Sequence, residues 1–320
     1  MRLVTFAARG RTRIGALAGD WVIDLTSAAQ ARDAAAGAPH PAAQARAAVP
    51  PSMRRFLAGG DDALALARRL VDDTRTRLTG TGAAALEAAG IAWRRGEVRL
   101  LPPVPAPPKI LCVGRNYAEH AREGGSAPPE IPIFFGRFPH SLLGPGEPYV
   151  MPRASTQVDY EGELAVIIGA GGRDIPEARA LEHVAGYAIF NDLSIRDYQR
   201  RTSQWMLGKN FDRSGPFGPA LVTRDEVPDP QALTLTVDVS GERMQEADTS
   251  TMIFSVAYLI ADVSRALTLE PGDVIATGTP SGVGFARTPP RWLRPGDLVR
   301  VEITGLGALD TPIIASDRAR

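Results

Sequence analysis

Five prolines within seven residues constrain this chain more than any other feature of its sequence. They stand at positions 102, 103, 105, 107 and 108. Because proline fixes its own φ angle and offers no backbone N–H, such a run forms a stiff, extended connector rather than a helix or the interior of a sheet. We therefore predict a small N-terminal domain over residues 1–101, a linker over 102–108 and a larger domain over 109–320.

The sequence before the linker predicts a small sheet followed by helices. Short apolar segments at Leu3–Phe6, Ile14–Leu17 and Trp21–Leu25 are typical of strands joined by tight turns. The alanine-rich stretch that follows has its clearest helical periodicity from Asp61 to Leu78. We expect this part to be a cap that carries no chemistry of its own.

Beyond the linker, predicted strands outnumber predicted helices. The longest strand candidate is Val158–Ile168, and Leu233–Val239 alternates in polarity before the two-residue turn Ser240-Gly241. The clearest helix spans Met252–Leu267. Because strands and helices do not alternate regularly, a doubly wound parallel sheet is disfavoured. We predict an α+β fold, mostly β, with a mixed and largely antiparallel sheet.

Composition excludes several classes of protein. With 44% hydrophobic and 22% charged residues the chain can bury a core, so dominant disorder is excluded. The 36 basic and 36 acidic residues balance, so no net field would attract nucleic acid or an anionic membrane. Cys112 is the single cysteine, which excludes an intrachain disulfide. No apolar run approaches the roughly 20 residues of a membrane helix. We expect a cytoplasmic protein with no nucleic-acid or membrane partner.

Two glutamates on one predicted strand give the strongest chemical signal. Side chains alternate along a strand, so Glu161 and Glu163 point to the same face, where burial without a cation would cost several kcal/mol or force one of them to stay protonated. Asp192 follows another apolar strand, 186–190, and offers a third carboxylate. Three carboxylates without cysteine or histidine at ligand spacing suit Mg²⁺, Mn²⁺ or Ca²⁺ better than zinc or copper. The alternative is a solvated strand end whose acids have no function.

A histidine–glutamate pair and one lysine complete the candidates from spacing and composition. His120 and Glu123 are three residues apart and are neighbours on one face of a helical turn. A carboxylate beside an imidazole holds its tautomer, as a general base acting on water requires. Lys209 is one of only two lysines among the 36 basic residues, so it is a candidate for a position that needs a compact ammonium. The alternative for the histidine–glutamate pair is a surface contact, and the alternative for Lys209 is a surface lysine without a function.

Five segments together resemble the fumarylacetoacetate hydrolase family in order and spacing, over roughly residues 107–310. They are Lys109–Glu123, Asp159–Gly169, Gly186–Asp197, Gly208–Asp212 and Pro271–Gly284, and the predicted helix over Met252–Ile260 matches as well. The resemblance implies a catalytic domain built as a mixed β-sandwich roll, here with a small N-terminal α/β cap domain. It also implies a homodimer and a divalent cation held by three carboxylates, with Mg²⁺ expected and Mn²⁺ or Ca²⁺ as alternatives.

The resemblance implies a role for each site residue. Glu161, Glu163 and Asp192 would hold the metal, which is the trio that the strand argument reaches. His120 and Glu123 match the pair that activates water in the family's acylpyruvate hydrolases, and Lys209 matches an active-site lysine. The substrate contacts would come from Arg115, Gln199 and Thr279, which fall where family members bind the carboxylate and keto oxygens.

The function that the resemblance implies is hydrolysis of a C–C bond in a 2,4-diketo acid through a metal-stabilised enolate. Two alternatives at the same site are isomerisation or tautomerisation, and decarboxylation, of a related keto acid. A third alternative, of another class, is a catalytically silent homologue that only binds. Where many family members have a lysine, this chain has Arg137, which we expect to alter the accepted acyl tail. The segment Phe138–Leu143 is expected to contribute to the pocket wall.

Overall fold

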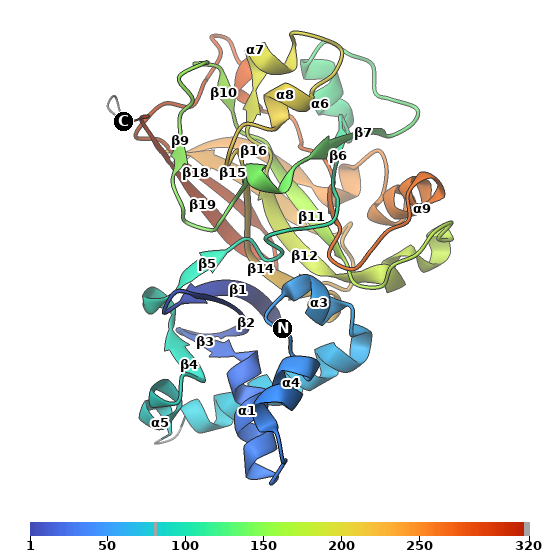
Figure 1. Ribbon diagram of the computed structural model, residues 1–320. Coiled ribbons are helices and arrows are strands. Elements are labelled where there is room, and N and C mark those ends of the chain that lie inside the picture. Colours follow the sequence, from blue (N-terminus) through green and yellow to red (C-terminus); the bar gives the residue numbers. More distant parts are fainter. Residues whose placement is uncertain (80–81, 317–320) are drawn as a thin grey trace.

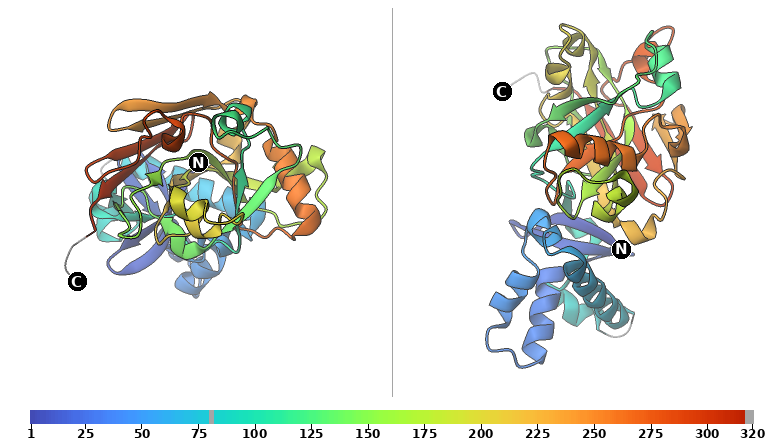
Figure 2. Two further views of the ribbon diagram at one scale, coloured as in Figure 1. Left: turned by 90° about the horizontal axis from the view of Figure 1, so that it is seen from above. Right: turned by 90° about the vertical axis from the view of Figure 1, so that its right-hand side faces the viewer.

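A computed structural model describes residues 1–79 and 82–316 (Figure 1). The N-terminal part contains a small antiparallel sheet and a group of helices, which form the lower lobe in Figure 1 and in the right-hand view of Figure 2. Its strands are β1 (Arg2–Ala8), β2 (Arg11–Ala18), β3 (Trp21–Asp24), β4 (Ala92–Arg94) and β5 (Arg99–Leu101). Its helices are α1 (Leu25–Ala35), α2 (Pro41–Ala48), α3 (Met53–Leu57), α4 (Gly60–Leu78) and α5 (Ala83–Ala88).

The remainder of the chain forms the larger body around two packed sheets. Strands β6 (Ile110–Gly114), β7 (Ile133–Arg137), β8 (Leu142–Leu143), β11 (Gly162–Ile168), β12 (Val184–Asn191), β14 (Gly215–Thr223) and β17 (Val274–Ala276) belong to the first sheet. The second contains β9 (Tyr149–Val150), β15 (Thr234–Val239), β16 (Glu242–Asp248), β18 (Leu298–Ile303) and β19 (Gly307–Ile314). The short strands β10 (Val158–Asp159) and β13 (Ser194–Ile195) pair separately, and the helices are α6 (Ala118–Glu123), α7 (Arg196–Gln199), α8 (Met206–Lys209) and α9 (Val256–Ala266).

The first sheet continues across the predicted domain boundary. Its order is β4-β3-β2-β1-β14-β12-β11-β17-β6-β7, with β5 also paired to β1 and β8 to β14. Strand β1 pairs antiparallel with β14, where Arg2 lies opposite Val222 and Leu3 opposite Leu221. The N-terminal strands and the larger body are thus joined by backbone hydrogen bonds, while the division at residues 102–108 stays a prediction.

Strand β11 is buried on both faces, which explains its unbroken apolar sequence. Leu164, Val166 and Ile168 belong to the core cluster that includes residues of the second sheet. Ala165 and Ile167 face the other way, into the cluster that contains the N-terminal helices. The mixed, largely antiparallel arrangement that the sequence predicts is confirmed, with parallel pairs only at β17–β6, β8–β14 and β9–β19 among the described residues.

Two predicted elements differ from the structure. The single strand over Val158–Ile168 is wrong, because the chain breaks into β10 and β11 at Tyr160 and Glu161. The backbone N–H of Glu161 donates to Asn191 Oδ1 at 3.2 Å, and its carbonyl accepts from Asp192 at 2.8 Å, so side-chain bonding replaces the regular ladder there.

The helix predicted from Met252 begins later, at Val256. Ser255 is its N-cap, and the Ser255 hydroxyl accepts from the N–H of Tyr258 at 3.1 Å. An N-capping serine fixes the start of a helix more strongly than the apolar residues that precede it. The helix over Asp61–Leu78 and the hairpin around Ser240-Gly241 agree with α4 and with β15–β16.

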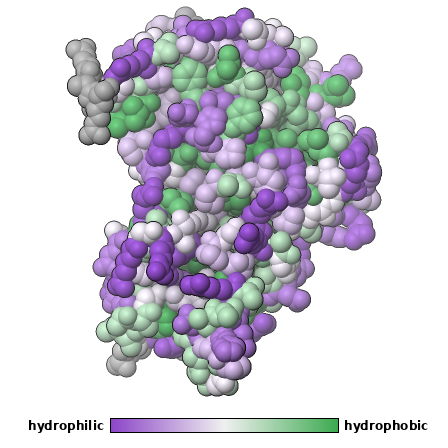
Figure 3. All heavy atoms as spheres, in the orientation of Figure 1, coloured by the Kyte–Doolittle hydropathy of each residue, from purple (hydrophilic) through white to green (hydrophobic). Residues whose placement is uncertain are grey.

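The surface is mixed in polarity. Polar residues cover most of the face seen in Figure 3, and hydrophobic residues lie scattered between them rather than in one band. Among residues 1–79 and 82–316, no helix combines the length and apolar character that crossing a bilayer would require.

Candidate metal centre

Three buried acids meet where β11 and β12 lie side by side. Glu163 is on β11, Glu161 lies in the break before it, and Asp192 directly follows β12. Gly162 pairs with Asn191 across the two strands, so the register itself brings the acids together. One carboxylate oxygen from each acid lies within 4.8 Å of those from the other two. The arrangement that the strand argument predicts is therefore present.

The charges of this cluster fit a divalent cation. Burial, together with the negative charges of Asp192 and Glu161, raises the pKa of Glu163 well above its usual range. Glu163 Oε2 accepts one hydrogen bond, from the backbone N–H of Gly278 at 3.0 Å. A hard cation with oxygen ligands would relieve the repulsion between these carboxylates. All three side chains offer carboxylate oxygens, which are the ligands that Mg²⁺ and Mn²⁺ prefer.

Two cations that line the cavity contact the cluster directly. Lys209 Nζ donates to Glu161 Oε2 at 2.5 Å and to Asp192 Oδ2 at 2.6 Å. Arg196 Nε donates to Asp159 Oδ2 at 2.8 Å, and its Nη2 lies 2.6 Å from Glu161 Oε1. Burial alone would raise the pKa of Glu161, but the charges of Arg196 and Lys209 outweigh it and lower the pKa to about 2. Glu161 is therefore held in its ionised form.

Arg137 lies behind the cluster rather than in the substrate pocket. Its guanidinium is buried, contacts Asp192 Oδ1 and donates to Ser214 Oγ at 2.6 Å and Ser141 Oγ at 3.3 Å. The side chain does not line the cavity. The expectation that Arg137 alters the accepted acyl tail stays a prediction, and any such effect would be indirect, because the charge of Arg137 is directed at a metal-ligand candidate.

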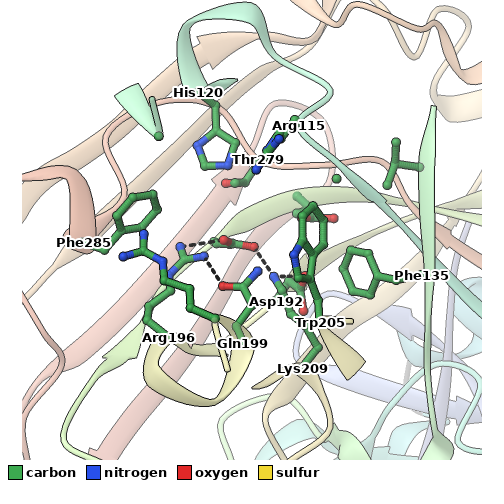
Figure 4. Close-up of a pocket in the computed structure, with 16 residues that line it drawn as sticks. Arg115, His120, Phe135, Asp192, Arg196, Gln199, Trp205, Lys209, Thr279 and Phe285 are labelled. Atoms are coloured by element: carbon green, nitrogen blue, oxygen red, sulfur yellow. Dashed lines mark hydrogen bonds and ion pairs between the residues drawn. The ribbon is translucent and has the colours of Figure 1, made fainter. Parts of the chain in front are cut away.

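The histidine–glutamate pair is formed on α6. His120 Nδ1 lies 2.8 Å from Glu123 Oε1, and Glu123 Oε2 accepts from the backbone N–H of Gly282 at 2.8 Å. Because the carboxylate can only accept, Nδ1 carries the proton and Nε2 keeps a lone pair. Figure 4 shows the His120 ring pointing into the site. His120 thus has the tautomer of a base, held by a carboxylate that is itself tied to another loop.

A cavity of about 270 Å³ joins these groups. Phe135 and Trp205 stand on one side and Phe285 on the other (Figure 4). The Phe135 and Trp205 rings meet edge to face with centroids 5.7 Å apart. The predicted wall over Phe138–Leu143 is wrong, because none of these residues lines the cavity and Leu142 and Leu143 are buried in the core.

All nine residues predicted for the site come together. Eight line the cavity, and Glu123 lies behind His120: the eight are Arg115, His120, Glu161, Glu163, Asp192, Gln199, Lys209 and Thr279. Sequence reasoning assigned no role to Asp159, Arg196, Arg200, Trp205 or Phe285. Asp159 could have been selected, since it stands two residues before Glu161 and continues the spacing of the two glutamates. Trp205 lies in an irregular segment and Phe285 in a three-residue 3-10 turn, Gly284–Ala286, where no periodic pattern could have selected them.

Comparison with known proteins decides the family. Residues 109–314 match the family model described as the fumarylacetoacetate (FAA) hydrolase C-terminal domain. The chain belongs to the fumarylacetoacetate hydrolase family. The family and the fold class predicted from sequence are both confirmed, whereas the roles of the nine residues stay predictions.

Three relatives of this family member illustrate its range. Human mitochondrial oxaloacetate tautomerase FAHD2A is 43% identical over 268 residues, covering 83% of this chain and 81% of that protein. The structure of fumarylacetoacetate hydrolase from Exiguobacterium antarcticum is 35% identical, with a TM-score of 0.77 over 99% of this chain and 100% of that one. Fumarylpyruvate hydrolase from Pseudomonas aeruginosa, in complex with Mn²⁺ and pyruvate, is 36% identical with a TM-score of 0.61, covering 68% of this chain and 92% of that one.

Proposed function

We propose that this protein is a divalent-metal-dependent enzyme that acts on a 2-keto acid, and that it hydrolyses a C–C bond in a 2,4-diketo acid. The observation that carries the proposal is the His120 imidazole, held by Glu123 with its Nε2 free, beside three buried carboxylates. Glu161, Glu163 and Asp192 would hold Mg²⁺ or Mn²⁺. A cation bound there would supply the positive charge that draws electrons toward the keto oxygen of the substrate.

Two polar side chains have donors free for the substrate. Gln199 Oε1 accepts from Arg196 Nη1 at 2.9 Å, which leaves the amide hydrogens of Gln199 to donate. Thr279 Oγ1 accepts from Gln245 Nε2 at 2.8 Å, which leaves its hydroxyl hydrogen to donate. Both residues line the cavity. We assign them, with Arg115, to the carboxylate and keto oxygens of the substrate.

The proposed hydrolysis begins at His120. Its Nε2 removes a proton from water, and the hydroxide attacks the carbonyl farther from the substrate carboxylate. The C–C bond between that carbonyl and the neighbouring CH₂ then breaks, and its electron pair moves to the pyruvate part as an enolate. Lys209 places its ammonium near the developing negative charge. The proton on His120 returns to the enolate carbon, and the products are pyruvate and a carboxylic acid.

Tautomerisation of an oxaloacetate-type keto acid is a second candidate. The 43% identity to human oxaloacetate tautomerase FAHD2A favours it. The same base can remove a proton from the carbon beside the keto group and return one to the enol, without attack by water. Decarboxylation is disfavoured by the His120–Glu123 pair, because loss of CO₂ needs no such base.

The first experiment measures pyruvate release from acylpyruvates of increasing chain length, with Mg²⁺, with Mn²⁺ and with EDTA. Metal-dependent release is the expected result. In parallel, the ultraviolet absorbance of oxaloacetate enol is followed with and without protein. Loss of enol absorbance without pyruvate release would replace hydrolysis by tautomerisation at the same site.

Two outcomes would change the proposal more deeply. Thermal stabilisation by Mg²⁺ without turnover of any keto acid would identify a homologue that binds but does not catalyse. Turnover that survives complete removal of metal would contradict the role given to the three acids. We also propose a homodimer, which sedimentation analysis of the purified protein would test.

A further inference from the structure

The cations that line the cavity divide into two kinds. Lys209 and Arg196 each contact two carboxylates. Arg115 and Arg200 contact none among the residues that the structure describes, although each, like Lys209 and Arg196, lies against an aromatic ring. Arg115 lies 5.5 Å from the centroid of Trp205, and Arg200 lies 4.3 Å from the centroid of Phe285.

Charge balance makes these two arginines surplus to the metal site. Glu161, Glu163 and Asp192, with Asp159 behind them, carry four negative charges when ionised. Three buried cations, Arg137, Arg196 and Lys209, match three of those charges. A divalent cation would match the fourth and leave one positive charge, which a single carboxylate of a keto acid neutralises. Arg115 and Arg200 would then still face the same cavity with no carboxylate of the described residues in salt-bridge contact.

Position distinguishes Arg200 from Arg115. Phe285, on which Arg200 lies, packs beside the end of α6, because a β-carbon at Gly124 would lie 3.6 Å from its ring. Figure 4 shows Phe285 on the side opposite Phe135 and Trp205. In the proposed reaction His120 acts on the carbonyl remote from the metal-bound end. The part of the substrate beyond that carbonyl therefore extends past α6, toward Phe285 and Arg200.

We propose that Arg200, held against Phe285, binds a carboxylate at the far end of the substrate, so that the enzyme selects dicarboxylate 2-keto acids over monocarboxylates of the same length. This proposal rests on the proposed function, because it assumes that a keto acid binds with its head at the metal. Arg200 is exposed at the edge of this group of cations; partial desolvation and the charge of Arg196 lower its pKa, and the charge of Asp159 opposes that change. An incoming carboxylate would raise that pKa.

The test compares two five-carbon keto acids, 2-oxopentanedioate and 2-oxopentanoate, which differ by one terminal carboxylate. Their dissociation constants are measured by titration calorimetry on the Mg²⁺-loaded protein and on the variants Arg200→Met and Arg201→Met. Arg201 is the matched control, since it is exposed, stacks on Tyr198 at 3.5 Å and does not line the cavity. Circular dichroism of each variant verifies that it is folded.

Wild type and Arg201→Met should bind the dicarboxylate about tenfold more tightly than the monocarboxylate. Arg200→Met should lose most of that preference, with the affinity for 2-oxopentanoate nearly unchanged. Equal binding of the two acids by wild type, or a preference that survives Arg200→Met, would overturn the proposal and leave the proposed function intact. An equal loss in both variants would also overturn it, because it would indicate a general surface field. Failure of both acids to bind in Mg²⁺ would overturn the proposed function as well.

Discussion

The carboxylate of Asp192 divides its two oxygens between two buried cations. Oδ1 contacts Arg137 and Oδ2 accepts from Lys209 at 2.6 Å. The planar guanidinium of Arg137 also reaches two serine hydroxyls, which a lysine ammonium at the end of a flexible stem would not do in the same geometry. Arg137 thereby sets the orientation of a residue that we assign to the metal.

Replacement of Arg137 should weaken metal binding. Arg137→Met would leave one oxygen of Asp192 buried and unpaired, and outer contacts of this kind typically change metal affinity by about 10–100-fold. Arg137→Lys should lose less, because it keeps the charge. Titration calorimetry with Mn²⁺ measures both effects. Arg213→Met, which removes an exposed contact to Glu147, is the control and should leave the affinity unchanged. Equal Mn²⁺ affinities for Arg137→Met and wild type would refute the positioning role.

Glu163→Gln should separate metal binding from stability. The amide keeps an oxygen to accept from Gly278 but removes a charge that is buried beside Asp192 and Glu161. We expect Mn²⁺ binding to be abolished in calorimetry. In EDTA the melting temperature should rise, since a buried Glu163 must either repel Asp192 and Glu161 or take up a proton on folding, and the glutamine does neither. A lower melting temperature in EDTA would indicate that the Glu163 charge is compensated without metal.

At the scale of elements, helix α6 is tied to a distant loop through Glu123, its last residue. Glu123 accepts from His120 through one oxygen and from Gly282 through the other. The helix is only six residues long, so its own hydrogen bonds hold it weakly. Its place over the cavity therefore depends on the contact with Gly282.

Glu123→Gln should inactivate the base without disturbing the fold. The glutamine oxygen can still accept from Gly282, but its NH₂ group would then face His120 Nδ1. The imidazole would have to accept there and carry its proton on Nε2, which is the wrong tautomer for a base. We expect kcat to fall by about 100-fold or more, with Mn²⁺ affinity unchanged. Steady-state kinetics on the best acylpyruvate of the panel measures the loss, and a kcat within threefold of wild type would contradict the assignment.

Local patterns predicted local structure well. The periodicity of Asp61–Leu78 located α4 to within one residue, and Ser240-Gly241 located the hairpin. The break before β11 escaped prediction because Asn191, 30 residues away, bonds to Glu161 there. Such side-chain bonds depend on tertiary structure, which no spacing within one segment encodes.

Those site residues could be predicted whose positions follow from the pattern of a single predicted strand. Glu161 and Glu163 followed from alternation along one strand, and Asp192 from its place after another. The aromatic walls and the position of Arg200 did not follow, since Trp205 reaches the cavity from an irregular segment and Phe285 from a three-residue 3-10 turn. The family resemblance added the roles, but not the contacts that Arg137 and Arg196 make behind the acids.

At the scale of the whole molecule, the N-terminal lobe completes the sheet that carries the acids. Strand β1 covers β14, β14 pairs with β12, and β12 leads directly to Asp192. The N-terminal ammonium of Met1 donates to Thr223 Oγ1 at 2.8 Å at the end of β14. Backbone pairing therefore connects the first residues of the chain to the metal centre through two strands.

The pairing of β1 with β14 also covers a sheet edge that would otherwise be open to pairing with another chain. A chain shortened to begin at Lys109 would present β14 as an open edge, with unpaired N–H and C=O groups beside the apolar residues Ala220 and Leu221. We expect that fragment to aggregate edge to edge, whereas the full chain stays dispersed at the same concentration. Light scattering after size-exclusion chromatography measures the difference. On this prediction, the N-terminal lobe prevents edge-to-edge aggregation of the sheet by covering β14.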